Sequence, residues 1–144
     1  MLLALDGLTD PQNLGAIIRS AEALGAQGMI LPQRRSAGLT GSVAKVAAGA
    51  LEHLPVARVV NLNRSLEKLK DEGYTVVGLA EEGSATLSEV KFQGPLVVVV
   101  GSEDKGISLI TRRLCDQLVR IPLKGVTTSL NASVATSIFL YEVA

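Results

Sequence analysis

The sequence predicts an α/β domain in which helices cover both faces of a mostly parallel sheet. Short apolar segments alternate with helix-like patterns along the whole 144-residue chain, as they do in proteins built from βαβ units. Residues 96–100 are apolar at every position, which is typical of a strand buried on both faces. A chain of this length can bury a core without disulfides or metal ions, so we expect residues 1–144 to form one domain.

The first part of the chain predicts two strands and two helices. Residues 2–5 are a short apolar run that ends at turn residues, as a buried strand does. Residues 13–24 carry an apolar stripe at helical spacing and are followed by a glycine, which indicates a helix and its end. Residues 28–31 form a second strand, and residues 33–41 have the polar, basic and glycine-containing composition of an exposed binding loop. Residues 43–53 are rich in alanine, which favours a helix.

The middle of the chain continues the alternation of strands and helices. Residues 56–60 read as a strand, and residues 62–71 form an amphipathic helix that a glycine ends. Residues 75–79 are another β-rich run. Residues 81–94 are mixed and polar and predict no regular element, and the buried strand at residues 96–100 follows them.

The last part of the chain predicts a short helix, a strand, a polar loop and a long helix. Residues 109–114 form the short helix, with Arg112 and Arg113 expected to be exposed. Residues 117–123 alternate as a strand, and a loop rich in Thr and Ser follows. The helix at residues 131–143 is apolar on nearly every face, and such a helix is normally buried. One small domain leaves part of it uncovered, so we expect a homodimer that buries it.

The composition excludes several classes of protein. Fourteen basic and fourteen acidic residues give no net charge, so any RNA contact must come from a local patch. The single Cys115 and single His53 cannot form an internal disulfide or a His/Cys metal site, and we expect no metal. The longest apolar run is too short to span a bilayer, and no signal-like segment begins the chain, so we expect a cytoplasmic protein without a membrane partner.

Three polar loops follow expected strands, and loops at the carboxyl edge of a parallel sheet bind ligands. They comprise residues 9–13, 101–108 and 123–131. The middle loop has the two-glycine spacing of a phosphate-binding loop, but Ile107 occupies the position of the phosphate-contacting lysine. No glycine-rich dinucleotide motif follows the first strand. The sequence therefore argues against an NTPase and against a nicotinamide enzyme.

Three motifs in this order resemble those of the SpoU/TrmH family, which are SPOUT-class RNA 2′-O-ribose methyltransferases. They are NLGAIIR at residues 13–19, GSEDKG at residues 101–106 and SLNAS at residues 129–133. The resemblance covers essentially the whole chain. It is strongest to the bacterial 23S rRNA guanosine 2′-O-methyltransferases, through residues 5–11 and 35–39. It implies the SPOUT fold with a deep trefoil knot in the C-terminal half, S-adenosyl-L-methionine as the cofactor, and RNA, preferably rRNA, as the partner.

The resemblance also implies a role for individual residues. The catalytic set would be Asn13, Arg19, Glu103, Ser129 and Asn131, with Glu103 able to hold Arg19 or its neighbours. The cofactor contacts would be Leu79, Ala80, Gly101, Gly106, Ile121, Leu123 and Leu130. The RNA contacts would be Arg34, Arg35, Lys105, Arg112 and Arg113. Arg19 would hold the target phosphate through its guanidinium fork.

Several alternatives remain open at the level of sequence. Arg19 could be a solvated side chain paired with Glu22, and Glu103 could be a solvated loop carboxylate. Ser129 and Asn131 could simply cap a core helix. The substrate could be tRNA, or the chain could be an RNA-binding domain without turnover. Members of this subgroup usually carry an N-terminal RNA-binding domain; we expect none here and therefore weak RNA binding by the chain alone.

Overall fold

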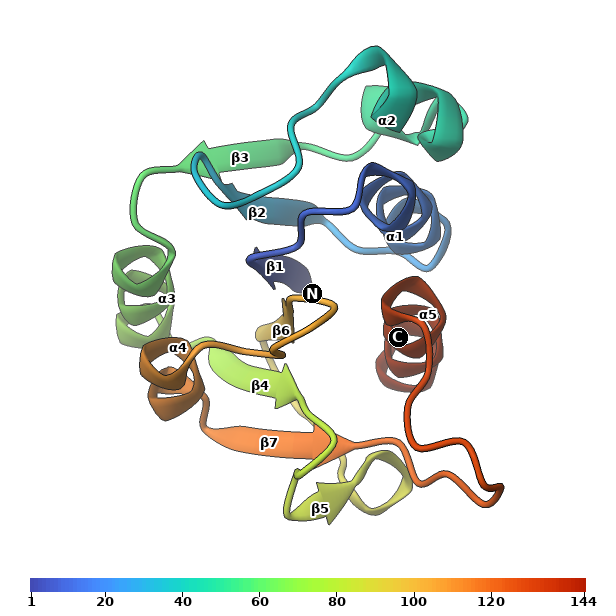
Figure 1. The fold of residues 1–144 in the computed structure, drawn as a ribbon. Coiled ribbons are helices and arrows are strands. Elements are labelled where there is room, and N and C mark those ends of the chain that lie inside the picture. The colour runs from blue at the N-terminus through green and yellow to red at the C-terminus, as the bar shows by residue number, and fades with distance from the viewer.

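The computed structural model describes residues 1–144 and contains one seven-stranded sheet in which every pair of neighbouring strands is parallel (Figure 1). The strand order is β3-β2-β1-β6-β4-β7-β5. The strands are β1 (Leu2–Asp6), β2 (Gly28–Pro32), β3 (Val56–Val59), β4 (Thr75–Leu79), β5 (Ala85–Thr86), β6 (Leu96–Gly101) and β7 (Gln117–Arg120). The helices are α1 (Pro11–Ala23), α2 (Gly41–Ala47), α3 (Leu62–Asp71), α4 (Leu109–Leu114) and α5 (Ala132–Val143), with short 3-10 helices η1 (Ala50–Glu52) and η2 (Leu87–Glu89).

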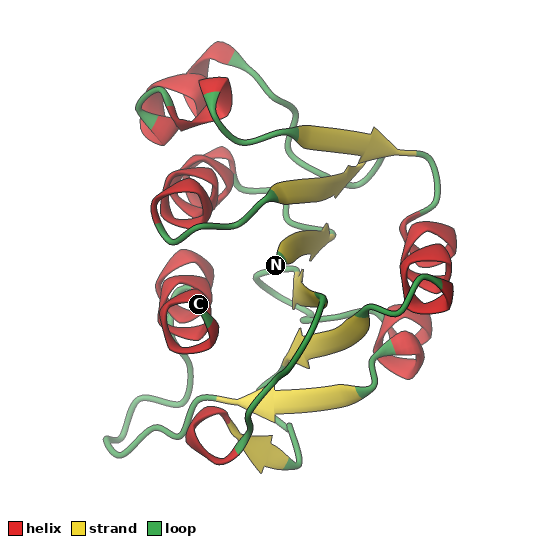
Figure 2. Ribbon diagram, turned by 180° about the vertical axis from the view of Figure 1, so that it is seen from behind, coloured by secondary structure: helices red, strands yellow, loops and turns green.

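The helices form two layers, one on each face of the sheet. Helices α1, α2 and α5 cover one face, and α3 and α4 cover the other, as the two opposite views show (Figures 1 and 2). Strand β6 lies at the centre between β1 and β4, and all six of its residues are buried. The expected α/β class, the parallel sheet and the doubly covered central strand are confirmed.

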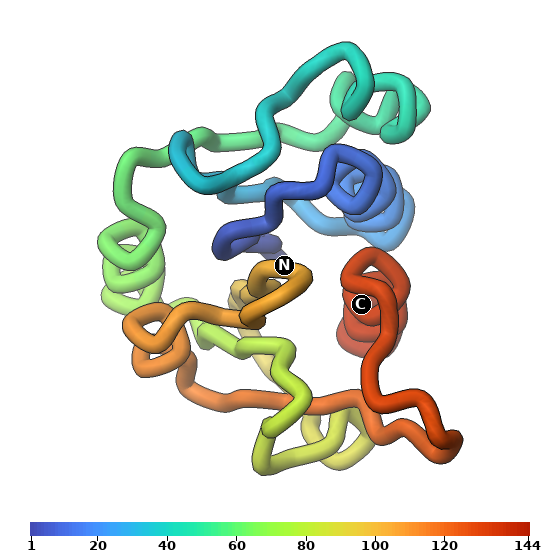
Figure 3. Tube along the Cα trace, viewed as in Figure 1, coloured from blue at the N-terminus to red at the C-terminus, as the bar shows by residue number.

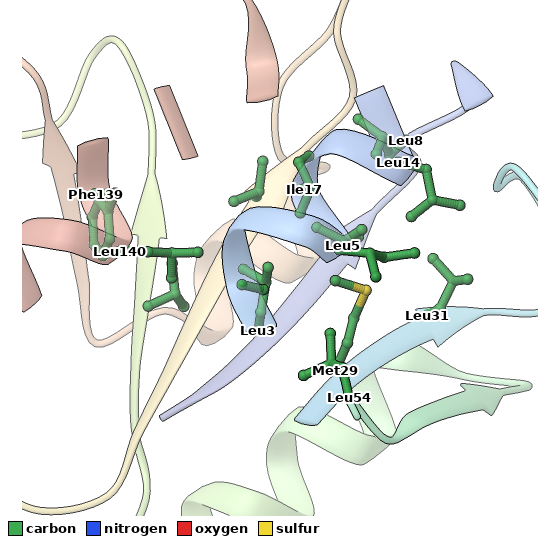
Figure 4. Close-up of a cluster of buried hydrophobic side chains, with 14 of the residues drawn as sticks. Leu3, Leu5, Leu8, Leu14, Ile17, Met29, Leu31, Leu54, Phe139 and Leu140 are labelled. Atoms are coloured by element: carbon green, nitrogen blue, oxygen red, sulfur yellow. The ribbon is translucent and has the colours of Figure 1, made fainter. Parts of the chain in front are cut away.

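Two apolar clusters hold the layers together, one on each face of the sheet. The larger lies under α1, α2 and α5, where Leu14 and Ile17 of α1 pack with Leu3 and Leu5 of β1 (Figure 4). Phe139 of α5 is fully buried in the same cluster. The smaller cluster lies under α3 and α4. Each fully buried side chain of this size stabilises the fold by about 1.5–3 kcal/mol relative to an exposed one, so these clusters fix the loops that the sheet carries.

Local capping explains where the first helix begins and ends. The Asp10 side chain accepts a hydrogen bond from the Gln12 N–H at 2.8 Å, and Pro11 occupies the first turn. Gly25, with a φ of +87°, follows the last turn in the left-handed region that glycine tolerates best. Helix α1 is therefore fixed at the end that carries Asn13.

Three sequence-based expectations about the elements need correction. The helix expected at 43–53 is broken, because Ala48 and Gly49 both have positive φ and separate α2 from η1. The strand expected at 117–123 ends at Arg120, because its neighbours β4 and β5 offer no partner beyond that residue. The segment 81–94, for which no element was expected, contributes the edge strand β5 and the short helix η2.

One chain covers only part of helix α5, as expected from its length and the apolar character of the helix. Phe139 and Leu140 are fully buried, but Val134, Ile138 and Tyr141 are 47%, 41% and 73% exposed. These three residues follow helical spacing and form one outward apolar face. No helix of the chain is long and apolar enough to cross a bilayer. The trefoil knot that the family resemblance implies stays a prediction.

Candidate active site

A cleft of about 380 Å³ lies where the loops after β4 and β6 meet the segment that enters α5. Figure 3 shows these three parts of the chain converging in front of the central strands. The cleft is lined by Asn13, Leu79, Ala80, Glu81, Glu82, Val100, Gly101, Ser102, Glu103, Asp104, Lys105, Gly106, Ile107, Arg112, Ile121, Leu123, Ser129, Leu130, Asn131, Ala132 and Ala135. All seven residues expected to contact the cofactor are among them.

The loop after β6 folds back tightly against the end of its own strand. Ser102 and Gly106 exchange two backbone hydrogen bonds of 3.0 Å, and the Lys105 N–H donates to the Ser102 hydroxyl at 3.0 Å. A Cβ on Gly101 would lie 2.0 Å from the Gly106 carbonyl carbon, so only glycine fits at this position. Ile107 follows with 3% exposure and joins the smaller core cluster, which explains an apolar residue where a phosphate-binding loop would need lysine.

A hydrogen bond between Asn13 in the first turn of α1 and Asn131 before α5 joins two parts of the chain that are far apart in the sequence. The Asn131 side-chain N–H donates to the Asn13 side-chain oxygen at 3.1 Å. The Asn131 oxygen accepts from the N–H groups of Ser133 at 2.9 Å and Val134 at 3.3 Å, which caps α5. Asn13 is 8% exposed. The helix cap expected as the structural alternative for Asn131 is therefore real, and the same side chain also lines the cleft.

Glu103 anchors the loop that precedes α1. Its carboxylate accepts hydrogen bonds from the N–H groups of Asp10 at 2.8 Å and Thr9 at 3.3 Å. Partial burial raises the pKa of Glu103, but hydrogen bonds from its own N–H, from Asp10 and Thr9, and from the Asn13 side chain outweigh it and hold the pKa below its usual value. Of the two options that the sequence left open for Glu103, holding Arg19 itself is not seen, and the carboxylate instead holds the loop before α1, the helix that carries Arg19.

The lowered pKa predicts how Glu103 contributes to stability as pH changes. A carboxyl whose folded pKa lies below its unfolded value of about 4.3 stabilises the fold above that pH, and the contribution is lost as pH falls through the folded pKa. The melting temperature of Glu103→Gln should therefore be lower than that of the unmodified chain at neutral pH, and the difference should shrink in acid. Asp104→Asn is the matched control, since Asp104 accepts no hydrogen bond in the chain. A difference independent of pH would contradict the anchor role.

The wall formed by the segment after β7 offers free backbone groups. No N–H between Ile121 and Leu130 donates a hydrogen bond within the chain. Pro122 has no N–H, and β7 has no neighbouring strand beyond Arg120. The backbone N–H groups of this segment therefore form no hydrogen bonds within the sheet. Ile121, Leu123 and Leu130 line the cleft, and backbone donors and acceptors beside them are available to a ligand.

Arg112 is less exposed than the sequence suggested, and its role as an RNA contact stays a prediction. It is half-buried and pairs with Glu82 of the β4–β5 loop, and its Nε is buried without a partner. Arg112 and Lys105 line the cleft, whereas Arg34, Arg35 and Arg113 are exposed outside it. The pair with Glu82 ties α4 to the loop after β4, so Arg112 shapes the cleft wall.

Arg19 is exposed on α1 and does not line the cleft of its own chain. It pairs neither with Glu22 nor with Glu103, because the only ion pairs are those of Lys70 with Asp116 and Arg112 with Glu82. Helix α1 packs beside α5, where the Ser137 hydroxyl donates to the Ser20 hydroxyl at 2.9 Å. Of the five residues expected to be catalytic, the cleft brings together Asn13, Glu103, Ser129 and Asn131.

The sequence missed several residues that line the cleft. Glu81 and Glu82 lie in the segment for which no element was expected, and Ser102 and Asp104 lie inside a recognised motif. The missed residues are next in the sequence to Ala80, Gly101 and Glu103, which were predicted to belong to the site. This adjacency is the signal that could have identified them. No group of three or more His, Cys, Asp or Glu side chains is placed to hold a metal ion.

A cleft at the carboxyl ends of parallel strands is where open α/β sheets bind their ligands, so fold and cleft define a ligand-binding α/β domain. Comparison with known families narrows this class. Residues 1–141 match the model of the SpoU rRNA Methylase family, and the chain belongs to this family.

Individual relatives agree with the family. The chain is 57% identical over 143 residues to an uncharacterized tRNA/rRNA methyltransferase of Synechocystis, covering 99% of this chain and 37% of that protein. It is 50% identical over 143 residues to the 23S rRNA (guanosine-2′-O-)-methyltransferase RlmB of Pseudomonas aeruginosa, covering 99% and 58%. The structure of the SpoU methyltransferase AviRb from Streptomyces viridochromogenes with AdoMet superposes with a TM-score of 0.91 at 33% identity, covering 99% and 58%. The chain thus spans 37% to 58% of the length of these proteins.

Proposed function

We propose that this chain binds S-adenosyl-L-methionine in the cleft and transfers its methyl group to a ribose 2′-hydroxyl of RNA, preferably a guanosine of 23S rRNA. The observation that carries the proposal is the meeting of Asn13, Glu103 and Asn131 beside Gly101 in one cleft, from the start of α1, the loop after β6 and the cap of α5. These residues come from the three motifs that resemble those of the family. The similar methyltransferase AviRb binds AdoMet on the same fold.

The residues of the cleft fit this cofactor. The volume of about 380 Å³ lies in the range of small-molecule sites. Leu79, Ile121, Leu123 and Leu130 would enclose the apolar parts of the cofactor, and the free backbone groups after β7 would bind its polar edges. Lys105, which forms no ion pair, offers positive charge for a carboxylate, and the acidic side chains of the cleft offer negative charge for an amino group. Bound there, the cofactor supplies an electrophilic methyl group.

The chain's own residues would orient the ribose 2′-hydroxyl that accepts the methyl group, rather than act as a strong base toward it. Methyl transfer needs the 2′-oxygen held in line with the methyl group, and positioning of this kind contributes much of the rate. Asn13, Ser129 and Asn131 can direct a hydroxyl without adding charge. Glu103 is a poor general base, because its oxygens already accept backbone hydrogen bonds and its pKa is lowered. We therefore assign Glu103 to positioning of the loop before α1.

The RNA class is the finer part of the proposal. The relatives include an rRNA guanosine methyltransferase and an uncharacterized protein named as a tRNA/rRNA methyltransferase. The test is transfer of radiolabelled methyl groups from S-adenosyl-L-methionine to 23S rRNA fragments and to tRNA. Labelling of the rRNA fragments alone is the expected result. Labelling of tRNA alone would show that the substrate is tRNA rather than rRNA. Labelling of neither RNA would refute the proposed function for this chain.

We further propose that two copies of the chain associate through α5. Val134, Ile138 and Tyr141 form an outward apolar face that this chain leaves uncovered. Arg19 lies on the neighbouring helix α1, so an α5 interface would place it beside the partner copy rather than over its own cleft. This arrangement reconciles the proposed role of Arg19 with its position.

The dimer has a direct test in solution. Ile138→Glu places a charge in the apolar face, and light scattering should then report the mass of one chain where the unmodified protein gives two. Leu109→Glu is the control, because Leu109 is 61% exposed on α4, on the other face of the sheet. A monomeric unmodified chain at micromolar concentration would contradict the interface.

A further inference from the structure

The charges of the chain are unevenly distributed, although they sum to zero. Residues 23–68 contain six basic residues but only two acidic ones; the basic residues are Arg34, Arg35, Lys45, Arg58, Arg64 and Lys68, and the acidic ones are Glu52 and Glu67. This segment builds β2, β3 and the beginning of α3, at one end of the sheet. The cleft lies at the other side of β1, around β6, β4 and β7. The molecule therefore has a basic end whose residues are not part of the proposed catalytic cleft.

An open groove of about 400 Å³ lies at this basic end, where β3 leads into α3. It is lined by Val59, Val60, Asn61, Arg64, Ser65 and Lys68. Arg64 and Lys68 are both exposed and stand one helical turn apart on the same side of α3. Neither forms an ion pair with a carboxylate. Their charges are thus available to an anionic partner.

The basic loop after β2 begins beside the groove. The Gln33 N–H donates to the Val59 carbonyl at 2.8 Å, so the loop that carries Arg34 and Arg35 begins beside the wall of the groove. Both segments follow the carboxyl ends of parallel strands, as the cleft loops do. Figure 1 shows the β2 and β3 ends and the start of α3 side by side. Arg34, Arg35, Arg64 and Lys68 form what we call the β3–α3 basic surface.

We propose that the β3–α3 basic surface binds the phosphate backbone of the RNA substrate, away from the nucleotide that is methylated. Three strand-to-strand steps separate β3 from β6, so the basic surface and the cleft lie at least about 14 Å apart along the edge of the sheet. One RNA segment can therefore contact the basic surface and the cleft at the same time. Basic side chains without ion-pair partners suit phosphate, whereas the absence of aromatic residues in the groove leaves no platform for stacked bases. The contact would add affinity without reading sequence. This inference rests on the proposed function.

The test removes two charges from the surface and leaves the cleft intact. Arg64→Gln/Lys68→Gln should bind a fluorescently labelled single-stranded RNA about tenfold more weakly at low salt. The slope of log affinity against log salt should become shallower by about 0.7 for each lost phosphate contact. Binding of S-adenosyl-L-methionine, measured by calorimetry, should not change, because neither residue lines the cleft. Both side chains are exposed, so the melting temperature should stay close to that of the unmodified chain.

A matched control separates a local contact from a general effect of charge. Lys91→Gln removes an exposed cation from the segment between η2 and β6, which is not part of the β3–α3 basic surface, and should leave RNA affinity and salt slope unchanged. If the double variant binds RNA with the affinity and slope of the unmodified chain, while that chain methylates RNA, the inference is wrong and the proposed function stands. If the unmodified chain neither binds nor methylates RNA, both are overturned.

Discussion

Gly101→Ala is expected to lower the affinity for S-adenosyl-L-methionine by roughly 10²-fold or more and to destabilise the fold. The new Cβ would lie 2.0 Å from the carbonyl carbon and 2.2 Å from the next amide nitrogen of the returning loop at Gly106 and Ile107. Overpacking by side chains costs about 1–3 kcal/mol, and each 1.4 kcal/mol is a factor of ten in binding. Here the clash is with backbone, which cannot rotate away, so the loop must leave the strand end and deform the cleft.

Calorimetric titration and thermal unfolding measure this result together. Gly41→Ala is the matched control, because no atom lies within 4 Å of a Cβ at Gly41 and its φ is not positive. The control should bind the cofactor normally. If Gly101→Ala binds within a few-fold of the unmodified chain, the loop does not form the cofactor wall that we propose.

Arg19→Ala is expected to cut turnover on RNA by on the order of 10²-fold or more while cofactor affinity stays nearly unchanged, the scale of losing one positioned catalytic group. Arg19 is exposed and outside the cleft of its own chain, so its loss should not disturb cofactor binding. A guanidinium stays protonated at accessible pH, which argues for a phosphate clamp rather than a base. Arg19→Lys keeps the charge but loses the fork, and should recover only part of the activity.

The control for Arg19 is another exposed arginine outside the cleft. Arg58→Ala, on the edge strand β3, should leave turnover at saturating RNA close to that of the unmodified chain. Single-turnover kinetics with cofactor and RNA in excess isolate the transfer step. Normal methylation by Arg19→Ala would make Arg19 an ordinary surface residue.

Much of the fold was predictable because hydrophobic periodicity reports burial directly. The helices expected at 62–71 and 109–114 and the strand expected at 75–79 have those bounds in the structure. The hydrophobic pattern failed to predict where an element ends when that end is set by backbone conformation or by the lack of a neighbouring strand. Alanine-rich sequence does not reveal that Ala48 adopts a positive φ, and alternation does not reveal that β7 runs out of partners at Arg120. Strand β5 has two residues and therefore no detectable period.

The location of the site was predictable, whereas the partners of its side chains were not. Loops after parallel strands meet at one edge, which brought Asn13, Glu103 and Asn131 together as expected. Glu103 binds backbone N–H groups, which every residue carries, so no residue type in the sequence marks its partners. Arg112 meets Glu82 from a separate element. Such pairs depend on tertiary distances that spacing along the chain does not encode.

The position of the transferred methyl group tests the central claim most directly. A ribose that carries a 2′-O-methyl group resists alkaline cleavage of the following phosphodiester, because the hydroxyl that attacks the phosphate is blocked. The chain is incubated with S-adenosyl-L-methionine carrying a labelled methyl group and with 23S rRNA fragments, and the product is digested with alkali. We expect the label in an alkali-resistant dinucleotide that begins with guanosine, and none when Asn131→Ala replaces the unmodified chain. Label in mononucleotides, as from a methylated base, would contradict ribose 2′-O-methylation.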